Sequence, residues 1–263
     1  MTPHETSPAD GLKISTLAER PELTRRLYEI ADDWPAFIPH EPVAGALLSR
    51  VPEEFPQYCV VATDGDRVVA RGFGVPFDAA SDGREEMPDQ GWDRVLVWAM
   101  RDRRGGAAVT AASALEITVD RDYLGRGLSY RMLAALRGAA GDQGHRDFLA
   151  PVRPTAKHLR PHLPMTEYVR LVRDDGLPQD PWLRVHVRAG GVIERIAPAS
   201  MTVSGSLDQW RAWTGLPLEA DGAVEVPGAL VPLRCDAAHG YAVYVEPNVW
   251  IRHGAGPAVA DGA

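Results

Sequence analysis

The N-terminal part of the chain shows two helical patterns and then two apolar runs typical of strands. Apolar side chains recur at helical spacing over residues 19–34, and a second helix is predicted over 42–50 because a proline starts it and another follows its end. The apolar, β-branched run 58–63 is followed by a turn and by a second such run, 67–75. This order predicts two helices followed by a β-hairpin.

The central part predicts a strand, a glycine turn, a helix and a strand in that order. A short amphipathic helix is first expected over 91–100. The apolar run 114–119 then predicts a strand, and a glycine-bearing turn leads from it into a helix over 128–140. Residues 148–152 have the composition of the next strand.

The C-terminal part, residues 198–253, is predicted to be rich in strands. Ser206 and Gln209 have the spacing of a capping box that opens a short helix. Strands are expected on both sides of this helix, at 201–203, 224–226, 230–234 and 241–245. Their aromatic and aliphatic side chains need a surface to bury against. Two interpretations stay open: this extension packs on the core formed by the preceding residues, or it forms the interface of a homodimer.

Composition places the chain among globular proteins. Its 263 residues, 45% of them hydrophobic and 24% charged, are enough to bury a core. No run of about 18 apolar residues is present, so no segment is expected to span a membrane. The net charge of −8 argues against a protein whose whole surface binds nucleic acid. The polar start of the chain, 1–11, lacks the features of a signal peptide, so a cytoplasmic location is expected.

The cysteines and histidines give no metal-binding pattern. Cys59 and Cys235 have no CxxC spacing and support neither a disulfide framework nor a structural zinc site. His158 and His162 have i,i+4 spacing, but Pro161 lies between them and no acidic ligand stands beside them. No metal site is therefore expected.

The turn that follows the first central strand contains Gly125 and Gly127. The first N–H groups of a helix have no acceptor within it and lie at the positive end of its dipole, so this turn is a candidate anion site. Arg121 or Arg126 would add positive charge, and a diphosphate is the natural occupant. No P-loop sequence is present, and the dinucleotide fingerprint is excluded because Tyr130 occupies its third glycine position. A tight turn without a ligand is the structural alternative.

The order of these elements resembles the GNAT superfamily of acyl-CoA-dependent N-acyltransferases. The pyrophosphate loop of that family reads Gln/Arg-x-x-Gly-x-Gly/Ala, and its small residues fall on Gly127 and Ser129. Its Gln/Arg position falls on Leu124, which departs from the family pattern. The resemblance covers residues 12–197, and this loop is its specific motif. Uncharacterised bacterial GNAT-like proteins are also similar to the chain over the stretches 150–154, 180–186 and 244–250.

The resemblance implies an α/β (α+β) fold with a mixed, mostly antiparallel central sheet flanked by helices. A domain at 12–197 would then carry the β-rich extension 198–253. The family uses an acyl-CoA, acetyl-CoA or another CoA thioester, as co-substrate, and a small-molecule amine as acceptor. Its pantetheine arm lies along the strand before the loop, where main-chain N–H groups polarise the thioester carbonyl. The cofactor-binding residues that this implies are Ile117, Thr118, Val119, Leu124, Gly125, Arg126, Gly127, Leu128 and Ser129.

Glu116 is the first candidate catalytic residue. It lies between Leu115 and Ile117 on the predicted strand. Because burial disfavours the charged form of a carboxyl group, a glutamate among apolar neighbours suits a general base. Several GNAT enzymes place a glutamate on this strand for that purpose. The structural alternative is a Glu116 that faces solvent or pairs with an arginine.

His186 and Tyr168 are candidates for the acid that protonates the leaving thiolate. Asp180-Pro181 and Gly190-Gly191 have the form of a helix start and stop, although the alternation over 183–189 also fits a strand. A helix is predicted. In the family, this helix often bears a tyrosine four residues before a Gly-Phe pair, and that position falls on His186. A histidine could donate this proton or act as a base toward the amine, whereas a core histidine is the structural alternative.

A basic, proline-rich stretch, residues 152–173, follows the last central strand and begins with Arg153 among its charged residues. It could bind a carboxylate on the acceptor or on the acyl donor, or face the 3′-phosphate of CoA. A solvated basic surface is the structural alternative.

Residues and resemblance together predict an enzyme, a GNAT-type acyltransferase that moves an acyl group from acyl-CoA to a small-molecule amine by direct attack. No covalent enzyme intermediate is expected, because neither cysteine has a base near it in sequence. Two other functions stay open. One is a non-catalytic acyl-CoA-binding sensor or partner protein, suggested by Leu124, and the other is a GNAT fold reused for decarboxylation or hydrolysis of a CoA thioester.

Overall fold

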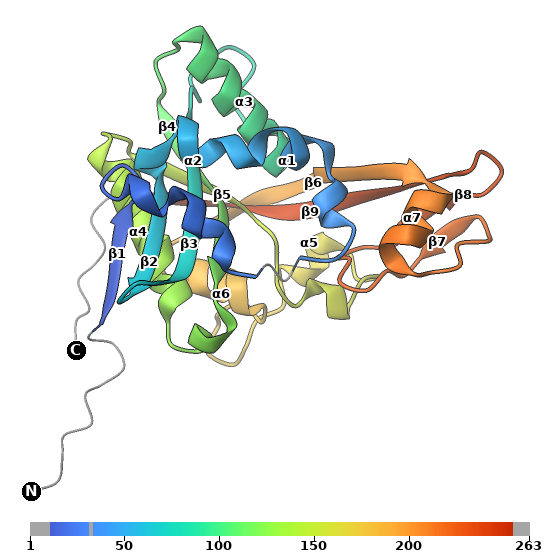
Figure 1. The fold of residues 1–263 in the computed structure, drawn as a ribbon. Helices are drawn as coiled ribbons and strands as arrows, with labels where there is room; N and C mark the ends of the chain where they lie inside the picture. The colour runs from blue at the N-terminus through green and yellow to red at the C-terminus, as the bar shows by residue number, and fades with distance from the viewer. Residues whose placement is uncertain (1–10, 32–33, 255–263) are drawn as a thin grey trace, which may run out of the picture.

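One twisted sheet organises the computed structural model, which describes residues 11–31 and 34–254 (Figure 1). Its strands follow the order β1-β2-β3-β4-β5-β9-β8-β7. The remaining strand, β6, is outside this order and pairs with β9. The β4–β5 pair is parallel and the other described pairs are antiparallel. The strands are β1 (Leu12–Thr16), β2 (Cys59–Asp64), β3 (Arg67–Phe77), β4 (Ala111–Val119), β5 (Asp147–Val152), β6 (Val192–Ser206), β7 (Gly222–Val224), β8 (Leu233–Asp236) and β9 (Tyr241–Gly254).

Helices cover both faces of this sheet. The α-helices are α1 (Pro42–Leu47), α2 (Val51–Glu54), α3 (Gly91–Gly105), α4 (Leu128–Asp142), α5 (Met165–Tyr168), α6 (Pro181–Arg188) and α7 (Leu207–Thr214). Short 3₁₀ helices are η1 (Pro21–Glu29), η2 (Ile38–His40), η3 (Leu48–Arg50), η4 (Pro56–Tyr58), η5 (Arg121–Tyr123) and η6 (Lys157–Leu159). Figure 1 shows α1, α2 and α3 together on one side of the sheet, and α7 with β7 and β8 at its far end. No described helix is both long and apolar enough to cross a bilayer.

The two faces of β3 meet different partners. A side chain added at Gly72 would crowd Leu136 of α4, 3.1 Å away, and Leu136 also lies within van der Waals distance of such a side chain at Gly74, so α4 packs on this face. Successive residues of a strand point to opposite faces, so Arg71 and Phe73 point away from α4. The guanidinium of Arg71 accordingly donates to the Leu27 carbonyl of η1, on the opposite face.

The strands β4 and β5 are paired over only part of their length. The register pairs Ala112 with Phe148 and Ser113 with Leu149, although both strands continue further. On its other side, β4 is irregular at Leu115, because Phe73 pairs with Glu116 whereas Gly74 pairs with Ala114. Such a bulge bends and twists a strand. The two strands separate beyond this point, and no described strand pairs there with the edge of β4 that faces β5.

Most elements agree with the sequence-based expectations. The hairpin, the helix after the glycine turn and the capping box at Ser206 are confirmed, and 181–188 forms the helix α6 rather than a strand. The helix expected over 19–34 is instead the 3₁₀ helix η1, and 32–33 lie outside the described residues. The strand expected at 201–203 is part of the 15-residue β6. Exposed, half-buried and buried positions do not alternate regularly along β6, so the sequence shows no strand period over its full length.

The segment 198–253 shares the core of the preceding residues. Its strand β9 lies in the sheet between β5 and β8. Trp210, Tyr244 and Trp250 are fully buried in the same hydrophobic cluster as the residues of β2 to β5. The proposed boundary between 197 and 198 falls within β6.

Candidate functional site

A cavity of about 820 Å³ opens where β4 and β5 separate. Residues of β4 line it from Ala114 to Val119, and the end of β5 lines it opposite them. The loop before α4 and the first turns of α6 contribute on one side. Segments of the N-terminal part, including Trp34 and Ala44, contribute on the other side. The cavity therefore reaches both faces of the sheet through the gap between the two strands.

The glycine turn lies at the α4 side of the cavity. Gly125 and Gly127 have φ of 74° and 72°, a left-handed conformation that L side chains rarely adopt. Gly127 is the N-cap of α4, and no side chain caps the helix there. The first N–H groups of α4 thus have no acceptor from a capping side chain, which is the arrangement of an anion site. The guanidinium of Arg126 lies over the Tyr123 ring, 4.9 Å from its centroid.

Five of the nine predicted cofactor-binding residues line the cavity directly: Ile117, Thr118, Val119, Leu124 and Ser129. The other four, Gly125 to Leu128, form the turn that connects them. Leu124 is 59% exposed, so its side chain presents an apolar surface where the family pattern has a polar one. The structure therefore brings the predicted strand and the predicted loop to one cavity.

Glu116 lies in this cavity with an arginine partner. Its Oε1 accepts from Arg71 Nε at 2.7 Å and from the Thr118 hydroxyl at 3.0 Å, and both members of the ion pair are buried. Because Phe73 pairs with Glu116 across the sheet, Glu116 shares the face of Arg71, opposite α4. Oε2 has no hydrogen-bond partner in the part of the chain that the structure describes. The surroundings of Glu116 are thus ionic and not purely apolar, and one carboxylate oxygen is available to a ligand.

His186 reaches the cavity from α6. Its Nδ1 lies 2.9 Å from Nε2 of His253 on β9, and its ring packs edge-on against Trp182. Burial lowers the pKa of His186 well below its ordinary value, and a positive charge on His253 when that ring is protonated, or on Arg137, acts in the same direction. The His186 imidazole is therefore neutral at pH 7. A neutral imidazole donates or accepts a hydrogen bond, but it is a weak proton donor to a thiolate.

Tyr168 is not brought to this cavity. Its hydroxyl donates to Asp180 Oδ2 at 2.8 Å. Asp180 also accepts from the amides of Trp182 and Leu183 as the N-cap of α6. Burial and this carboxylate raise the pKa of Tyr168. The contacts of Tyr168 anchor the start of α6, and it is not among the described residues that line the cavity.

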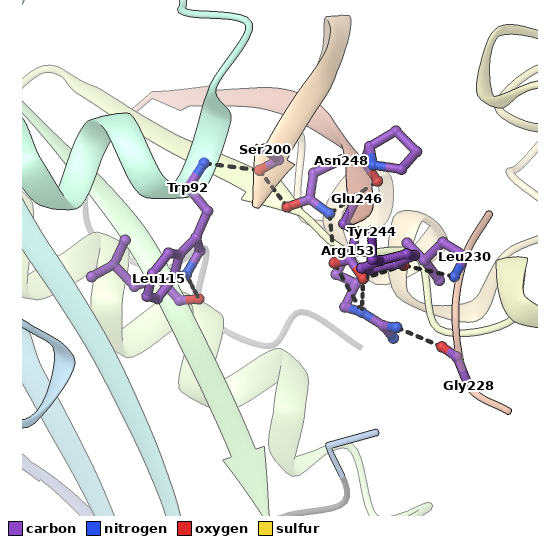
Figure 2. Close-up of polar contacts among 10 residues, drawn as sticks. Trp92, Leu115, Arg153, Ser200, Gly228, Leu230, Tyr244, Glu246 and Asn248 are labelled. Carbon is purple, nitrogen blue, oxygen red and sulfur yellow. Dashed lines mark hydrogen bonds and ion pairs between the residues drawn. The ribbon is translucent and has the colours of Figure 1, made fainter. Parts of the chain in front are cut away.

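A chain of hydrogen bonds connects α3, β4, β6 and β9 beside the cavity (Figure 2). The indole Nε1 of Trp92 donates to the carbonyl of Leu115 at 2.9 Å, at the β4 bulge. The Trp92 amide donates to Ser200 Oγ at 2.8 Å, and Ser200 donates to Asn248 Oδ1 at 2.6 Å. The Asn248 amide then donates to Glu246 Oε1 at 3.2 Å. This chain fixes the conformation of β4 where its edge becomes unpaired.

Charged groups gather around the same region. Arg153, directly after β5, lines the cavity and pairs with the fully buried Glu246. Burial, with Glu41 and Glu246 nearby, raises the pKa of Asp93 to about 8. Asp93 Oδ1 is buried without a hydrogen-bond partner in the described part of the chain. Neutralised ion pairs thus line or adjoin the cavity, and a carboxyl group that is protonated at pH 7, Asp93, directly follows the lining residue Trp92.

Three site residues were missed by sequence reasoning: Arg71, Trp92 and Ser200. Arg71 had a detectable signal, because it is a lone charge inside the apolar run 68–77. Trp92 and Ser200 had none, because tryptophan in an amphipathic helix and serine in a strand are ordinary residues. Among residues 11–31 and 34–254, no group of three or more His, Cys, Asp or Glu side chains has a metal-binding arrangement.

Comparison with known proteins gives one relative over nearly the whole chain. No family model matches the chain. It is 34% identical to the arginine N-acetyltransferase avaD of Aspergillus versicolor, in an alignment that covers 92% of this chain and 94% of that protein.

Two solved structures share the fold. One is the loading GNATL domain of CurA from Lyngbya majuscula, with 14% identity, a TM-score of 0.57, and coverage of 92% of this chain and 96% of that chain. The other is the GphF GNAT-like decarboxylase in complex with isobutyryl-CoA, with 15% identity, a TM-score of 0.50, and coverage of 93% and 99%. At these identities the two structures establish the fold alone.

Proposed function

Since the chain belongs to the GNAT superfamily of N-acyltransferases, we propose that it transfers an acyl group from acyl-CoA to an amine of arginine or of a closely related cationic amino acid. The acceptor class comes from the relative that is 34% identical over 92% of the chain, an arginine N-acetyltransferase. The observation that carries the reaction is the cavity between β4 and β5. It joins the amide-rich turn before α4 to the buried Glu116.

The donor end of the cavity fits a CoA thioester. The uncapped N-terminus of α4 and the left-handed Gly125 and Gly127 suit a diphosphate. Among residues 11–31 and 34–254, no strand pairs beyond Ser113 with the β4 edge that faces β5, so its main-chain groups are available to the amides of a pantetheine arm. In this assignment Leu124 packs against the arm, and backbone N–H groups replace the side chain that the family pattern has there.

Glu116 accepts the proton of the attacking amine. Arg71 and Thr118 hold its Oε1, which leaves Oε2 for the amine N–H. The amine nitrogen attacks the thioester carbon, the carbon–sulfur bond breaks, and the proton that Glu116 has taken is returned to the leaving thiolate. Main-chain N–H groups of β4 near the bulge stabilise the carbonyl oxygen as it becomes negative.

His186 has a binding role in this assignment. The neutral ring of His186 offers a hydrogen bond to the sulfur or to a pantetheine amide, and it is not the cationic acid. Tyr168 is left with the structural role that its bond to Asp180 gives it. The cysteines take no part as nucleophiles, because burial raises the pKa of Cys59 to about 12 and also raises that of Cys235.

Thiol release from acetyl-CoA, measured with and without L-arginine, tests this function. We expect release that depends on the amine and yields N-acetylarginine. Release without the amine would instead indicate hydrolysis or decarboxylation of the thioester. Binding of acetyl-CoA with no release for any cationic amino acid would indicate a sensor.

The Glu116→Gln variant tests the base. Removing a general base lowers kcat by roughly 10²- to 10⁴-fold, and acetyl-CoA affinity should stay within about twofold. The exposed Glu225 provides the matched control, Glu225→Gln, with unchanged kcat. A Glu116→Gln enzyme as fast as wild type would remove Glu116 from the mechanism.

The oligomeric state, the domain boundary and the location of the protein are separate predictions. A homodimer through the segment 198–253 stays a prediction, as does the division of the chain at residue 197. A cytoplasmic location also stays a prediction, and residues 1–10 lie outside the described part of the chain.

A further inference from the structure

We propose that Arg153 binds a carboxylate of the acceptor, so that the enzyme selects amino acids over the amines that result from their decarboxylation. This inference rests on the proposed function, transfer to a cationic amino acid. It concerns which acceptors are accepted and does not alter the reaction itself.

Arg153 stands at the acceptor side of the cavity. It follows directly after β5 and lines the cavity. Its guanidinium carbon lies 5.8 Å from the ring centroid of Trp34, another lining residue. Trp34 belongs to the N-terminal segment between η1 and η2, and η1 bonds Arg71 on the sheet face opposite α4. Arg153 therefore meets the side of the cavity that carries Glu116, away from the loop that suits the diphosphate.

The guanidinium is held rigidly by protein contacts. Its Nε lies 3.0 Å from both carboxylate oxygens of Glu246, and its Nη2 donates to the Gly228 carbonyl at 2.7 Å (Figure 2). Glu246 is itself fixed by the hydroxyl of Tyr244 and the amide of Asn248. A side chain fixed in this way loses little rotamer entropy when a ligand binds.

Donor groups of Arg153 remain available to a ligand. A guanidinium has five N–H donors, and Nη1 has no partner in the part of the chain that the structure describes. The side chain is 17% exposed, so this end is not sealed from the cavity. Planar N–H groups of arginine match the geometry of a carboxylate.

Glu246 makes the interaction selective and not merely attractive. Because the buried carboxylate of Glu246 already balances the charge of Arg153, the site has little net positive charge to draw in any anion. A bound carboxylate gains directed hydrogen bonds, and an amine that lacks it leaves the Nη1 donors partly dehydrated and unpaired. Sites of this kind reject the analogue that lacks the partner group.

The experiment compares amino acids with their decarboxylated amines. Thiol release from acetyl-CoA gives kcat/KM for L-arginine and agmatine, and for L-ornithine and putrescine. We expect wild type to prefer the amino acid of a pair by at least about tenfold. In Arg153→Gln this ratio should fall toward one, through a higher KM for the amino acid, while the rate with the amine stays within a few-fold of wild type.

Two further variants keep the test decisive. Arg153→Gln leaves Glu246 buried without its countercharge, which destabilises a fold. The double variant Arg153→Gln/Glu246→Gln removes both charges and should show the same loss of preference. Arg234→Gln, at an exposed arginine of β8 away from the cavity, should leave the preference unchanged.

Each other outcome overturns the proposal in a recognisable way. The preference for the amino acid could survive in both Arg153 variants, or activity could fall equally on both members of a pair. Either result would mean that Arg153 is a structural residue, and the proposed function would stand. A changed preference between acetyl-CoA and malonyl-CoA, with the acceptor preference intact, would assign the carboxylate to the acyl donor. If wild type acylates neither member of either pair, the proposed function itself fails.

Discussion

His186 and His253 are hydrogen-bonded to each other, with Nδ1 of His186 2.9 Å from Nε2 of His253. Both side chains are buried, and His253 Nδ1 has no partner within the described residues. Burial lowers the pKa of both rings, and that of His253 falls to about 4. The pair therefore connects α6 to β9 in its neutral form, and protonation of either ring opposes folding.

Acid should destabilise the protein through this pair. Between pH 6.5 and about 4 the unfolded chain binds protons at these histidines and the folded chain does not, so stability falls as the pH falls through this window. One pKa unit corresponds to about 1.4 kcal/mol, so His253 alone accounts for a loss of about 3 kcal/mol by pH 4. Denaturant unfolding at several pH values from 4 to 7 measures this change in the free energy of unfolding. His253→Gln should flatten the dependence, and an equal slope in that variant would contradict this account. His239→Gln, at an exposed turn, is the control.

Asp93 should have the opposite pH dependence. Its pKa is raised from 3.8 to about 8, so the folded chain keeps a proton that the unfolded chain releases, and stability falls as the pH rises between these values. Asparagine cannot ionise. Asp93→Asn should therefore gain more than about 1 kcal/mol relative to wild type between pH 5 and pH 8. Thermal or urea unfolding at both pH values tests it, with the exposed Asp82→Asn expected to show no such gain.

Gly127→Ala should weaken CoA binding. A side chain at φ 72° costs about 1–2 kcal/mol, so the turn must shift and its amides with it. We expect the Kd for CoA in calorimetry to rise at least about tenfold. Gly106→Ala is the matched control, because Gly106 ends α3 at φ 65° and the space around it is equally open. It should cost similar stability and leave the affinity for CoA unchanged. Equal effects of both variants on affinity would argue against an anion site at the turn.

Trp92→Phe should lower kcat more than it affects acetyl-CoA binding. The variant keeps a ring but loses the bond to the Leu115 carbonyl, which holds β4 at its bulge. The loss of one buried hydrogen bond costs about 1 kcal/mol of stability. Steady-state kinetics should show a severalfold lower kcat with the KM for acetyl-CoA within about twofold. The control is Trp98→Phe on the same helix, where the ring stacks on Phe77 outside the cavity lining. The same kcat loss in both variants would mean a general effect of packing.

Local features of the chain were readable from the sequence alone. The β2–β3 hairpin, the Gly125–Gly127 turn, the capping box of α7 and the ends of α6 each depend on residues that lie within a few positions of one another. Turn geometry, capping and hydrophobic periodicity act over that range. The strand that carries Glu116 and the loop at the proposed donor end of the cavity were found for this reason.

Tertiary structure alone decided which side chains meet at the site. Arg71 reaches Glu116 from 45 positions away, His253 reaches His186 from 67, and Glu246 reaches Arg153 from 93. The order of the strands, their register and the bulge at Leu115 bring these residues together although they are far apart in the sequence. No local sequence pattern indicates such contacts, because each residue fits its own strand or helix whichever side chain it meets in the folded protein. The sequence therefore determined the strand and the turn to which we assign the donor. The fold of the whole sheet determined the charge around the proposed base, the neutral state of His186 and the place of Arg153 in the cavity lining.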